Sequence, residues 1–283
     1  MTAPSLELTQ FTVRETAPGY WRITFDHPPA NLMTAVTAAE LRTIVEAAET
    51  ASDLRVMVFD SANEQFFFAR YDVSQGPLPA DPGPTGLPIF LDTTVRLGAL
   101  PAISIAQIAG RARGGGNELA LSCDLRYAAL ESAVFGQPEI GSALVPAGGG
   151  LERLVSLVGR SRTLEIAATG NDYDAATAEL YGWITRAVPA ADLPGFVDAL
   201  ARRIAGFDGA ALAEIKRLVG RTTLTDPAAL LDSSETATRL TGGPGFRPAL
   251  ERVRARARAV GADFDLRMGF HIGTADEDRA PRR

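Results

Sequence analysis

The segment from Gly110 to Ala120 reads Gly-Arg-Ala-Arg-Gly-Gly-Gly-Asn-Glu-Leu-Ala and lies between an apolar run and a helical pattern. Glycine lets a backbone approach a ligand closely, and the first N–H groups of a helix have no partner within that helix. Such a turn can hold a negative charge on a ligand. Its spacing matches neither of the glycine patterns that bind dinucleotides or nucleotide phosphates. From the glycines alone, an anion-binding turn and a tight turn packed on a sheet are equally open.

Two glutamates stand where they could move protons. Glu118 lies inside the glycine-rich segment, and Glu139 lies in the sequence Phe-Gly-Gln-Pro-Glu-Ile-Gly at 135–141. A carboxylate held between proline and apolar residues can be shielded from water, which raises its pKa and suits it to proton transfer. A strand predicted at 123–128 separates the two glutamates, so the topology can bring them to one end of a sheet. The spacing does not prove this, and the alternative for Glu139 is a loop carboxylate facing water.

A third segment, Phe-Phe-Ala-Arg-Tyr-Asp-Val at 67–73, follows an apolar run that predicts a buried strand at 54–59. Aromatic residues at the end of a strand usually belong to the core. Taken by itself, this segment therefore predicts packing.

The elements that must position these segments alternate between strand and helix. Alternating apolar and polar residues predict a hairpin over 6–15 and 20–25. Apolar residues at helical spacing follow Thr37, which we expect to cap that helix. A helix at 89–100 and a strand at 102–108 come next. This alternation predicts an α/β layered fold with a mostly parallel sheet.

The second half of the chain has a different character. After three glycines at 148–150, helical patterns dominate to about Arg258, interrupted by a strand-like piece at 183–188. The last residues are polar and charged, as is common at disordered chain ends. We expect an α/β core at 1–200, a helical region at 201–270 and a disordered tail at 271–283.

The composition limits the classes of function. The 283 residues are 46% hydrophobic and 22% charged, which is typical of a globular protein with a sizeable core. Acidic residues outnumber basic ones by 34 to 28, so no general attraction to nucleic acid or to an anionic membrane is expected. Arginines at every second position from Arg252 to Arg258 would spread around a helix. That spacing favours a subunit interface or a solvated helix over a nucleic-acid site.

Cysteine and histidine are scarce. Cys123 is the one cysteine, so there is no internal disulfide, and the chain fits a reducing compartment. With two histidines in the whole chain and none near Cys123, no metal site is expected. The first residues lack the pattern of a signal peptide, and no apolar run of about 18 residues occurs. These features predict a cytoplasmic protein without a nucleic-acid or membrane partner.

Taken together and in this order, the three segments resemble the crotonase family, also called the enoyl-CoA hydratase/isomerase superfamily. Residues 110–153 carry most of the resemblance, which extends over roughly 6–220. The motifs are Gly-Gly-Gly-Asn-Glu-Leu at 114–119, Cys123-Asp124, the 135–141 segment, Pro-Ala-Gly-Gly-Gly at 146–150 with Arg153-Leu154, the early loop His-Pro-Pro-Ala-Asn at 27–31, and the segment from Ala178 to Pro189.

The resemblance implies a fold, a substrate and an assembly. The expected fold is a crotonase-like spiral of ββα units with a helical C-terminal region that mediates trimerisation. The expected substrate is an acyl-CoA thioester, and the expected assembly is a homotrimer or homohexamer. No metal or redox cofactor is implied, because CoA is part of the substrate.

The resemblance also implies roles for particular residues. Backbone N–H groups of Ala69 and Gly115 would hold the thioester oxygen as negative charge develops on it. Glu118 would activate a water molecule, and Glu139 would exchange the proton on the carbon next to the thioester. Two glutamates favour an enoyl-CoA hydratase-type lyase, which adds water to a 2-enoyl-CoA and yields a 3-hydroxyacyl-CoA.

The sequence departs from the family pattern in the segment at 67–73. The usual pattern is close to Phe-Ser-Ala-Gly-Ala-Asp-Leu, whereas here Arg70 and Tyr71 stand in place of Gly-Ala before Asp72. An arginine would be strained if this position needs a positive φ. The new side chains also add bulk near the expected path of the CoA arm. We expect Arg70, Tyr71 and Asp72 to contact the substrate.

Three explanations of this departure stay open. The site could accept an unusual acyl group that makes a polar contact with Arg70 or Tyr71. It could catalyse another crotonase-type reaction, such as isomerisation or hydrolytic C–C cleavage. It could also be a catalytically inactive oligomeric scaffold, although two retained glutamates speak against that. Lys216, the one lysine, could meet a CoA phosphate or be a solvated helix residue.

Overall fold

The computed structural model describes residues 6–76, 81–223 and 225–273. Its main sheet has six strands in the order β1-β2-β3-β4-β6-β9. β1 and β2 form the predicted antiparallel hairpin, and every further pairing in this sheet is parallel. The strands are β1 (Phe11–Ala17), β2 (Tyr20–Phe25), β3 (Val56–Ser61), β4 (Ile103–Ile108), β6 (Leu125–Ala129) and β9 (Arg186–Val188).

A second sheet of three strands lies beside the first and leads into the functional segments. It has the order β5-β7-β8, with β5 parallel to β7 and β7 antiparallel to β8. Its strands are β5 (Arg111–Arg113), β7 (Val134–Gly136) and β8 (Tyr173–Asp174). Because the chain passes from β4 to β5 and from β6 to β7, it alternates between the sheets. This is the predicted ββα spiral.

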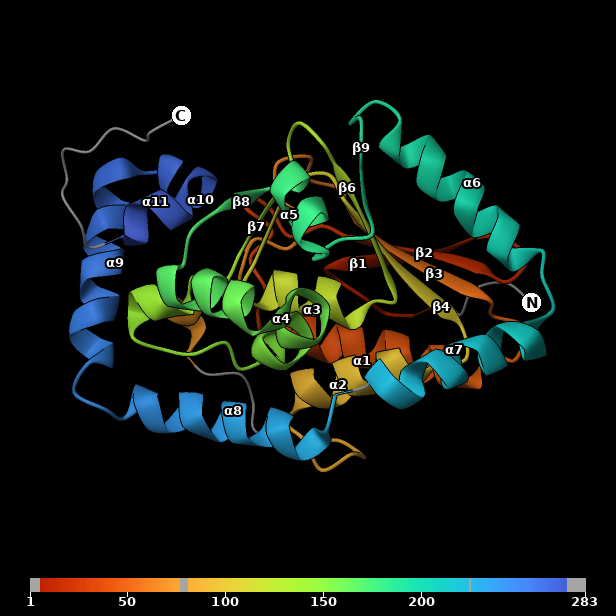
Figure 1. Ribbon diagram of the computed structural model, residues 1–283, viewed down its shortest axis with the longest axis horizontal. Helices are drawn as coiled ribbons and strands as arrows, with labels where there is room; N and C mark the ends of the chain where they lie inside the picture. The colour runs from red at the N-terminus through yellow and green to blue at the C-terminus, as the bar shows by residue number, and fades with distance from the viewer. Residues whose placement is uncertain (1–5, 77–80, 224, 274–283) are drawn as a thin grey trace.

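Helices cover the main sheet on both sides (Figure 1). Helix α1 (Ala35–Thr50) and α2 (Ile89–Ala99) pack against each other on one side, and α6 (Leu193–Ala205) covers the other. The expected cap of α1 was misplaced by three residues. Thr34 is the N-cap and accepts from the Thr37 N–H, while the Thr34 N–H donates to Thr37 Oγ1 at 2.8 Å, which completes a capping box.

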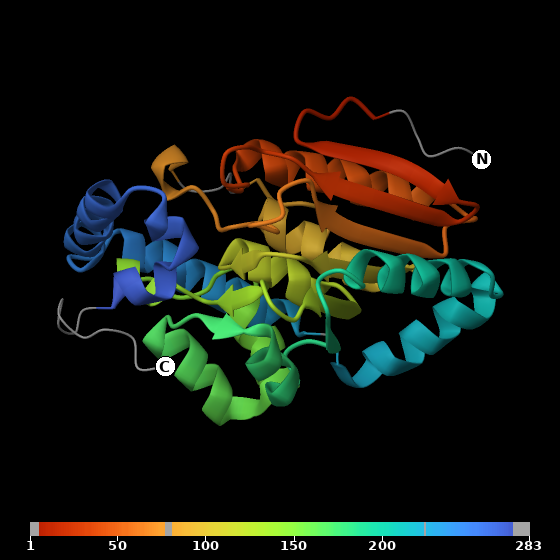
Figure 2. The same ribbon diagram turned by 90° about the horizontal axis from the view of Figure 1, so that it is seen from above.

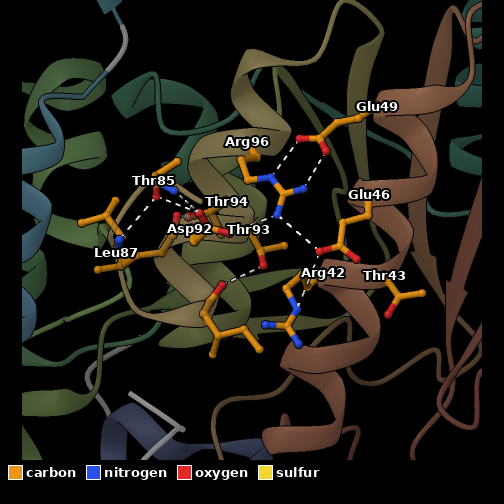
Figure 3. Close-up of polar contacts among 12 residues, drawn as sticks. Arg42, Thr43, Glu46, Glu49, Thr85, Leu87, Asp92, Thr93, Thr94 and Arg96 are labelled. Atoms are coloured by element: carbon orange, nitrogen blue, oxygen red, sulfur yellow. Dashed lines mark hydrogen bonds and ion pairs between the residues drawn. The ribbon is translucent and has the colours of Figure 1, made fainter. Parts of the chain in front are cut away.

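Polar contacts fix α2 relative to its neighbours (Figure 3). Arg96 makes two hydrogen bonds to the Glu49 carboxylate of α1, at 2.8 and 2.6 Å. Arg96 also pairs with Asp92, at 3.1 Å, and Asp92 accepts hydrogen bonds from the backbone and side chain of Thr85. Helix α2 is therefore tied both to α1 and to the loop that precedes it.

The remaining helices alternate with strands as far as β9, and the last of them cluster at one end of the molecule. The short α3 (Gly115–Ser122) follows β5, and a 3-10 helix, η2 (Glu139–Ser142), follows β7. The others are α4 (Gly150–Thr169), α5 (Ala175–Tyr181), α7 (Gly209–Thr223), α8 (Pro227–Thr241), α9 (Phe246–Val260), α10 (Asp263–Leu266) and α11 (Met268–Ile272). Figure 2 shows α9–α11 at the end opposite to α6 and α7.

The C-terminal helical region is confirmed, but two details of the predicted organisation differ. The predicted boundary between residues 200 and 201 falls inside α6. The tail expected to be disordered from 271 was placed too early, because His271 and Ile272 belong to α11 and are buried. Residues 274–283 of that predicted tail lie outside the described residues. Within the described ranges, no helix combines the length and apolar character that crossing a membrane requires.

Candidate active site

Glu118 is placed by the glycine-rich turn that the sequence singled out. It lies in the first turn of α3, directly after β5, and is 4% exposed. Its Oε1 atom accepts hydrogen bonds from the backbone N–H groups of Gly148, at 2.7 Å, and Gly150, at 3.1 Å. Two N–H donors stabilise the ionised form of a carboxylate. The structure thus provides for a charge on Glu118 despite its burial.

The glycines at 148–150 are needed for this contact. A Cβ on Gly150 would lie 3.0 Å from Glu118 Oε1 and would also meet the Gln137 amide. A Cβ on Gly148 would meet the Glu118 carboxylate and lie 2.6 Å from the Phe90 ring. Arg153 holds the same loop, since its Nη1 donates to the Gly148 carbonyl at 2.8 Å and its Nη2 to Thr94 Oγ1 on α2 at 3.0 Å. Arg153 belongs to the motif that begins at Pro146, but the motif alone did not indicate this role.

Glu139 begins η2, which follows β7, and it faces the glycine turn that follows the neighbouring strand β5. A Cβ on Gly114 would lie 2.8 Å from Glu139 Oε1, so the carboxylate rests against the turn that precedes α3. Its Oε2 atom is buried and has no hydrogen-bond partner among the described residues. An unpartnered buried carboxylate oxygen favours the protonated form, because an uncompensated charge there would be costly. Glu139 is therefore not a loop carboxylate facing water.

The surroundings of the two glutamates raise both pKa values. Burial raises the pKa of Glu118 to about 7, with the Gly148 and Gly150 N–H groups opposing the effect. Burial raises the pKa of Glu139 well above its ordinary value, and the nearby Glu118 charge raises it further. Glu139 therefore holds its proton more firmly, and Glu118 ionises more readily. One acid and one base thus stand side by side.

The predicted donor Gly115 lies where a ligand can approach it. Gly115 begins α3, and its N–H makes no hydrogen bond within the described part of the chain. A Cβ on Gly115 would lie 3.1 Å from Met33 Sδ. A Cβ on the next residue, Gly116, would meet the carbonyl of Phe68. The glycine turn therefore packs directly on the segment that leads into the 69–72 loop.

The other predicted donor is occupied. Ala69 is 2% exposed, and its N–H donates to the Asn31 carbonyl at 3.0 Å. To hold a thioester oxygen, Ala69 would have to give up that bond, which the sequence did not anticipate. Two residues further along, the N–H of Tyr71 makes no hydrogen bond within the described residues. Met33 bonds instead to both neighbours of Tyr71: its N–H donates to the Arg70 carbonyl, and its carbonyl accepts from the Asp72 N–H.

Arg70 is not strained, and the polar groups of Arg70 and Tyr71 both have partners within the protein. Among the described residues other than glycine, positive φ occurs at Asn31 and Ala143 alone, so Arg70 is unstrained. Its guanidinium pairs with Asp265, 195 residues away, at 3.1 Å. The Tyr71 hydroxyl donates to the Gly76 carbonyl at 2.8 Å. Both polar groups are used within the protein.

Asp72 lies beside a cavity of about 440 Å³. The carboxylate caps the short 3-10 helix at 73–75 by accepting from Ser74 N at 3.0 Å. Most of the cavity wall comes from the early loop between β2 and α1 and from the start of α1, together with Gln10 and Gln75. None of the described residues that line this cavity is a lysine or arginine. Of the 69–72 loop, Asp72 is the residue that contributes to the cavity wall.

Two other residues have structural positions. The Lys216 ammonium pairs with Asp124 at 2.7 Å and donates to the Ala102 carbonyl at 2.8 Å, so it is held within the protein and is not a solvated helix residue. Cys123 is buried, as expected, and burial raises the pKa of its thiol to about 12. Within residues 6–76, 81–223 and 225–273, no group of three or more His, Cys, Asp or Glu side chains could hold a metal ion.

Comparison with known proteins gives the class to which this fold and site belong. The family model described as Enoyl-CoA hydratase/isomerase matches residues 15–236, so the chain belongs to that family. The Bacillus subtilis protein YngF, named as an enoyl-CoA hydratase/isomerase, is 33% identical over 241 residues, which cover 84% of this chain and 92% of YngF.

Two further relatives bear on substrate and fold. The carnitinyl-CoA dehydratase of Escherichia coli is 34% identical over 209 residues, covering 72% of this chain and 78% of the relative. The crystal structure of a protein described as an enoyl-CoA hydratase from Streptomyces avermitilis superposes with a TM-score of 0.90 at 32% identity. That match covers 96% of this chain and 99% of the other, so the likeness includes the C-terminal helices.

Proposed function

We propose that the protein hydrates a 2-enoyl-CoA to a 3-hydroxyacyl-CoA. The observation that carries the proposal is a pair of neighbouring glutamates in different surroundings: buried Glu118 accepts two backbone N–H groups, and half-buried Glu139 has a buried oxygen without a partner. Hydration needs a base for water and an acid for the α-carbon at the same time. Family membership supports the CoA thioester as the substrate class.

In the proposed reaction, ionised Glu118 takes a proton from water while the water oxygen bonds to C3 of the enoyl group. The C2–C3 π electrons shift toward the thioester, whose oxygen gains negative charge. Protonated Glu139 then gives its proton to C2, and the thioester carbonyl is restored. Proton exchange from Glu118 to Glu139 through solvent returns the site to its starting state.

We propose that the developing charge on the thioester oxygen is held by the Gly115 N–H and by an N–H of the 69–72 loop. Such donors typically lower a barrier by about 3 kcal/mol each. Ala69 is the donor that the resemblance implies, but the unpaired N–H of Tyr71 requires no bond to be broken first. Tyr71 is therefore our first choice and Ala69 the alternative.

The cavity beside Asp72 is our proposed site for part of the CoA arm. Since no described residue that lines it is a lysine or arginine, we assign it to an uncharged section of the arm and not to the phosphates. We retain the homotrimer or homohexamer as a proposal as well. It is supported by exposed apolar side chains on α5 and α7, such as Leu180 at 76% and Ile215 at 59%. No further cofactor enters the proposed chemistry.

Isomerisation of an enoyl-CoA is the second candidate. Isomerisation removes one proton from the substrate and returns one proton to it, which a single carboxylate can do. The two N–H donors that bond to the other glutamate would then have no role in catalysis. Hydrolytic C–C cleavage and a scaffold role have no specific observation in their favour. The buried oxygen of Glu139 that has no partner argues against a scaffold, because an unpaired buried carboxyl group destabilises a fold.

The test is hydration of crotonyl-CoA and of a longer 2-enoyl-CoA, followed by loss of absorbance. Glu118→Gln and Glu139→Gln should each lower kcat by about 10²- to 10⁴-fold, the range for loss of an acid or base. Glu165→Gln, at an exposed glutamate on α4, is the matched control and should retain full activity.

Hydrogen exchange at C2 of the 3-hydroxyacyl product in D₂O separates the two roles. Glu118→Gln should retain some of this exchange, and Glu139→Gln should abolish it. An isomerase would instead interconvert 3-enoyl and 2-enoyl esters without adding water. Absence of both turnover and CoA-ester binding in the unmodified protein would refute the proposal.

A further inference from the structure

The C-terminal block, defined as residues 263–272 (α10 and α11), lies against the proposed site. Phe264, Met268 and Ile272 form a small core with apolar side chains of α9. Ile272 also reaches η2, since a Cβ on Gly141 would lie 2.8 Å from the Ile272 Cβ. The block thus covers the short helix that begins at Glu139.

The block is bonded to the strand that leads into the glycine turn. Arg111 Nε donates to the Leu266 carbonyl at 2.8 Å, and Arg113 Nη1 donates to the Asp265 carbonyl at 2.6 Å. Arg113 is 1% exposed and is itself held by Asp172, at 2.6 and 2.9 Å. Asp172 also accepts from the Gly269 N–H of the block, at 3.1 Å. These bonds fix the block relative to Gly115, two residues after Arg113.

The same block is bonded to the other donor segment by one side chain. Asp265 Oδ1 accepts a hydrogen bond from Nε of Arg70 at 3.1 Å and forms an ion pair with Nη2 of the same guanidinium at 3.1 Å. The pair is partly exposed, with 18% of the Arg70 side chain and 25% of the Asp265 side chain accessible to solvent. Arg70 lies between Ala69 and Tyr71, the two candidate donors. Asp265 is therefore bonded through its backbone to the Gly115 side and through its carboxylate to the 69–72 side.

We propose that Asp265 is a positioning residue that sets the spacing between the two oxyanion donors, with Arg70 as its partner. This inference rests on the proposed function. It accounts for the departure of the loop from the family pattern: Arg70 contributes a link to the C-terminal block where the usual glycine would contribute none. A displacement of a donor by about 1 Å can lower a rate by about 100-fold, so a link that spans both sides affects catalysis directly.

The experiment uses the full-length protein and four variants: Asp265→Asn, Arg70→Gln, the exchange Arg70→Asp with Asp265→Arg, and the control Glu251→Gln. Glu251 pairs with Arg254 on the exposed face of α9. Glu251→Gln therefore removes one negative charge from the C-terminal helices, as Asp265→Asn does, without changing a contact of the loop. Asp265→Asn and Arg70→Gln should lower kcat by roughly 10- to 100-fold with little change in KM. The exchanged pair should recover part of that loss, and Glu251→Gln should match the unmodified protein.

Two further readouts separate positioning from a general structural effect. A 2-enoyl-CoA with an electron-donating aryl group shifts its absorption band to the red when its carbonyl is polarised, and that shift should be smaller in Asp265→Asn. Amide hydrogen exchange over residues 69–72, measured without substrate, should be about tenfold faster in both single variants, because the loop loses its link. Exchange over β3 should stay unchanged.

The outcomes are distinct for the two proposals. If kcat, the carbonyl band and the exchange rate of 69–72 all keep their unmodified values in Asp265→Asn, the positioning role is wrong. If the unmodified protein neither binds nor hydrates enoyl-CoA esters, the proposed function fails. The exchange measurement still decides in that case whether Asp265 holds the loop.

Discussion

The glutamate pocket and the 69–72 loop serve one proposed reaction but are held in place by different means. Glu118 is fixed by hydrogen bonds from the backbone N–H groups of Gly148 and Gly150, in a loop where a Cβ atom at 148, 149 or 150 would collide with its neighbours. The loop is fixed by a partly exposed ion pair to the far end of the chain. Close packing around buried groups is energetically strong, whereas a pair near the surface contributes little to stability. We therefore expect the first region to determine whether the site exists and the second to determine how well it works.

The largest effect should come from filling the space around Glu118. In Gly150→Ala the new methyl group would meet the Gln137 amide and lie 3.0 Å from Glu118 Oε1. Overpacking of this kind typically costs about 1–3 kcal/mol of unfolding free energy, and the displaced carboxylate should lower kcat by about 100-fold or more. Urea unfolding and steady-state kinetics measure both.

The matched control is Gly195→Ala in α6, where a Cβ would meet nothing within 4 Å. Alanine in an unhindered helix position stabilises by about 0.5–1 kcal/mol, and activity should not change. Equal behaviour of the two variants would show that the pocket tolerates side chains at 150 and would contradict the packing argument.

The second effect is on the pH dependence of catalysis. Because Glu118 acts as a base with its pKa at about 7, kcat/KM should fall by about tenfold for each pH unit below that value. At high pH the rate should fall again as Glu139 loses the proton that it must donate. Binding of butyryl-CoA, measured over the same range, shows whether a binding change causes either limb. A flat profile from pH 5 to pH 8 would contradict the assigned roles.

The third effect is a gain of stability on loss of function. The folded pKa of Glu118, about 7, exceeds the ordinary value of 4.5, so its contribution to stability is fully present below about pH 4.5. That contribution is lost as pH rises through 7, because the unfolded chain releases the proton first. The shift corresponds to about 3 kcal/mol at most. Glu118→Gln should therefore unfold at a higher temperature than the unmodified protein at pH 8, with the gain vanishing near pH 4.5. A similar gain at both pH values would mean that charge burial is not its source.

Sequence reasoning identified the first region well because its determinants are local. The glycine turn with Glu118, the 135–141 segment and the glycines at 148–150 are short motifs, and the glycine turn follows a strand that hydrophobic patterning located. The predicted topology allowed Glu118 and Glu139 to meet at one end of a sheet, although their spacing did not prove it.

The second region could not be predicted in the same way. Nothing near Arg70 in the sequence indicates Asp265, and no pattern distinguishes Asp265 from Asp263 two residues before it. The fate of the Ala69 N–H depends on the Asn31 carbonyl, which only the folded loop brings within reach. Likewise, Lys216 could be assigned to Asp124 only once α7 was seen against the sheet. Long-range polar contacts carry no periodicity, so they appear only in the fold.

The smallest expected effect is on the stability of Arg70→Gln, and it tests the comparison most directly. Ion pairs near the surface contribute about 0–1 kcal/mol, so the urea midpoint should move far less than in Gly150→Ala. The rate should nevertheless fall, since the lost contact spans the two donor segments. A loss of stability as large as that of Gly150→Ala would show that the C-terminal block is part of the folding core. In that case the distinction between a strongly packed pocket and a weakly tethered loop would not hold.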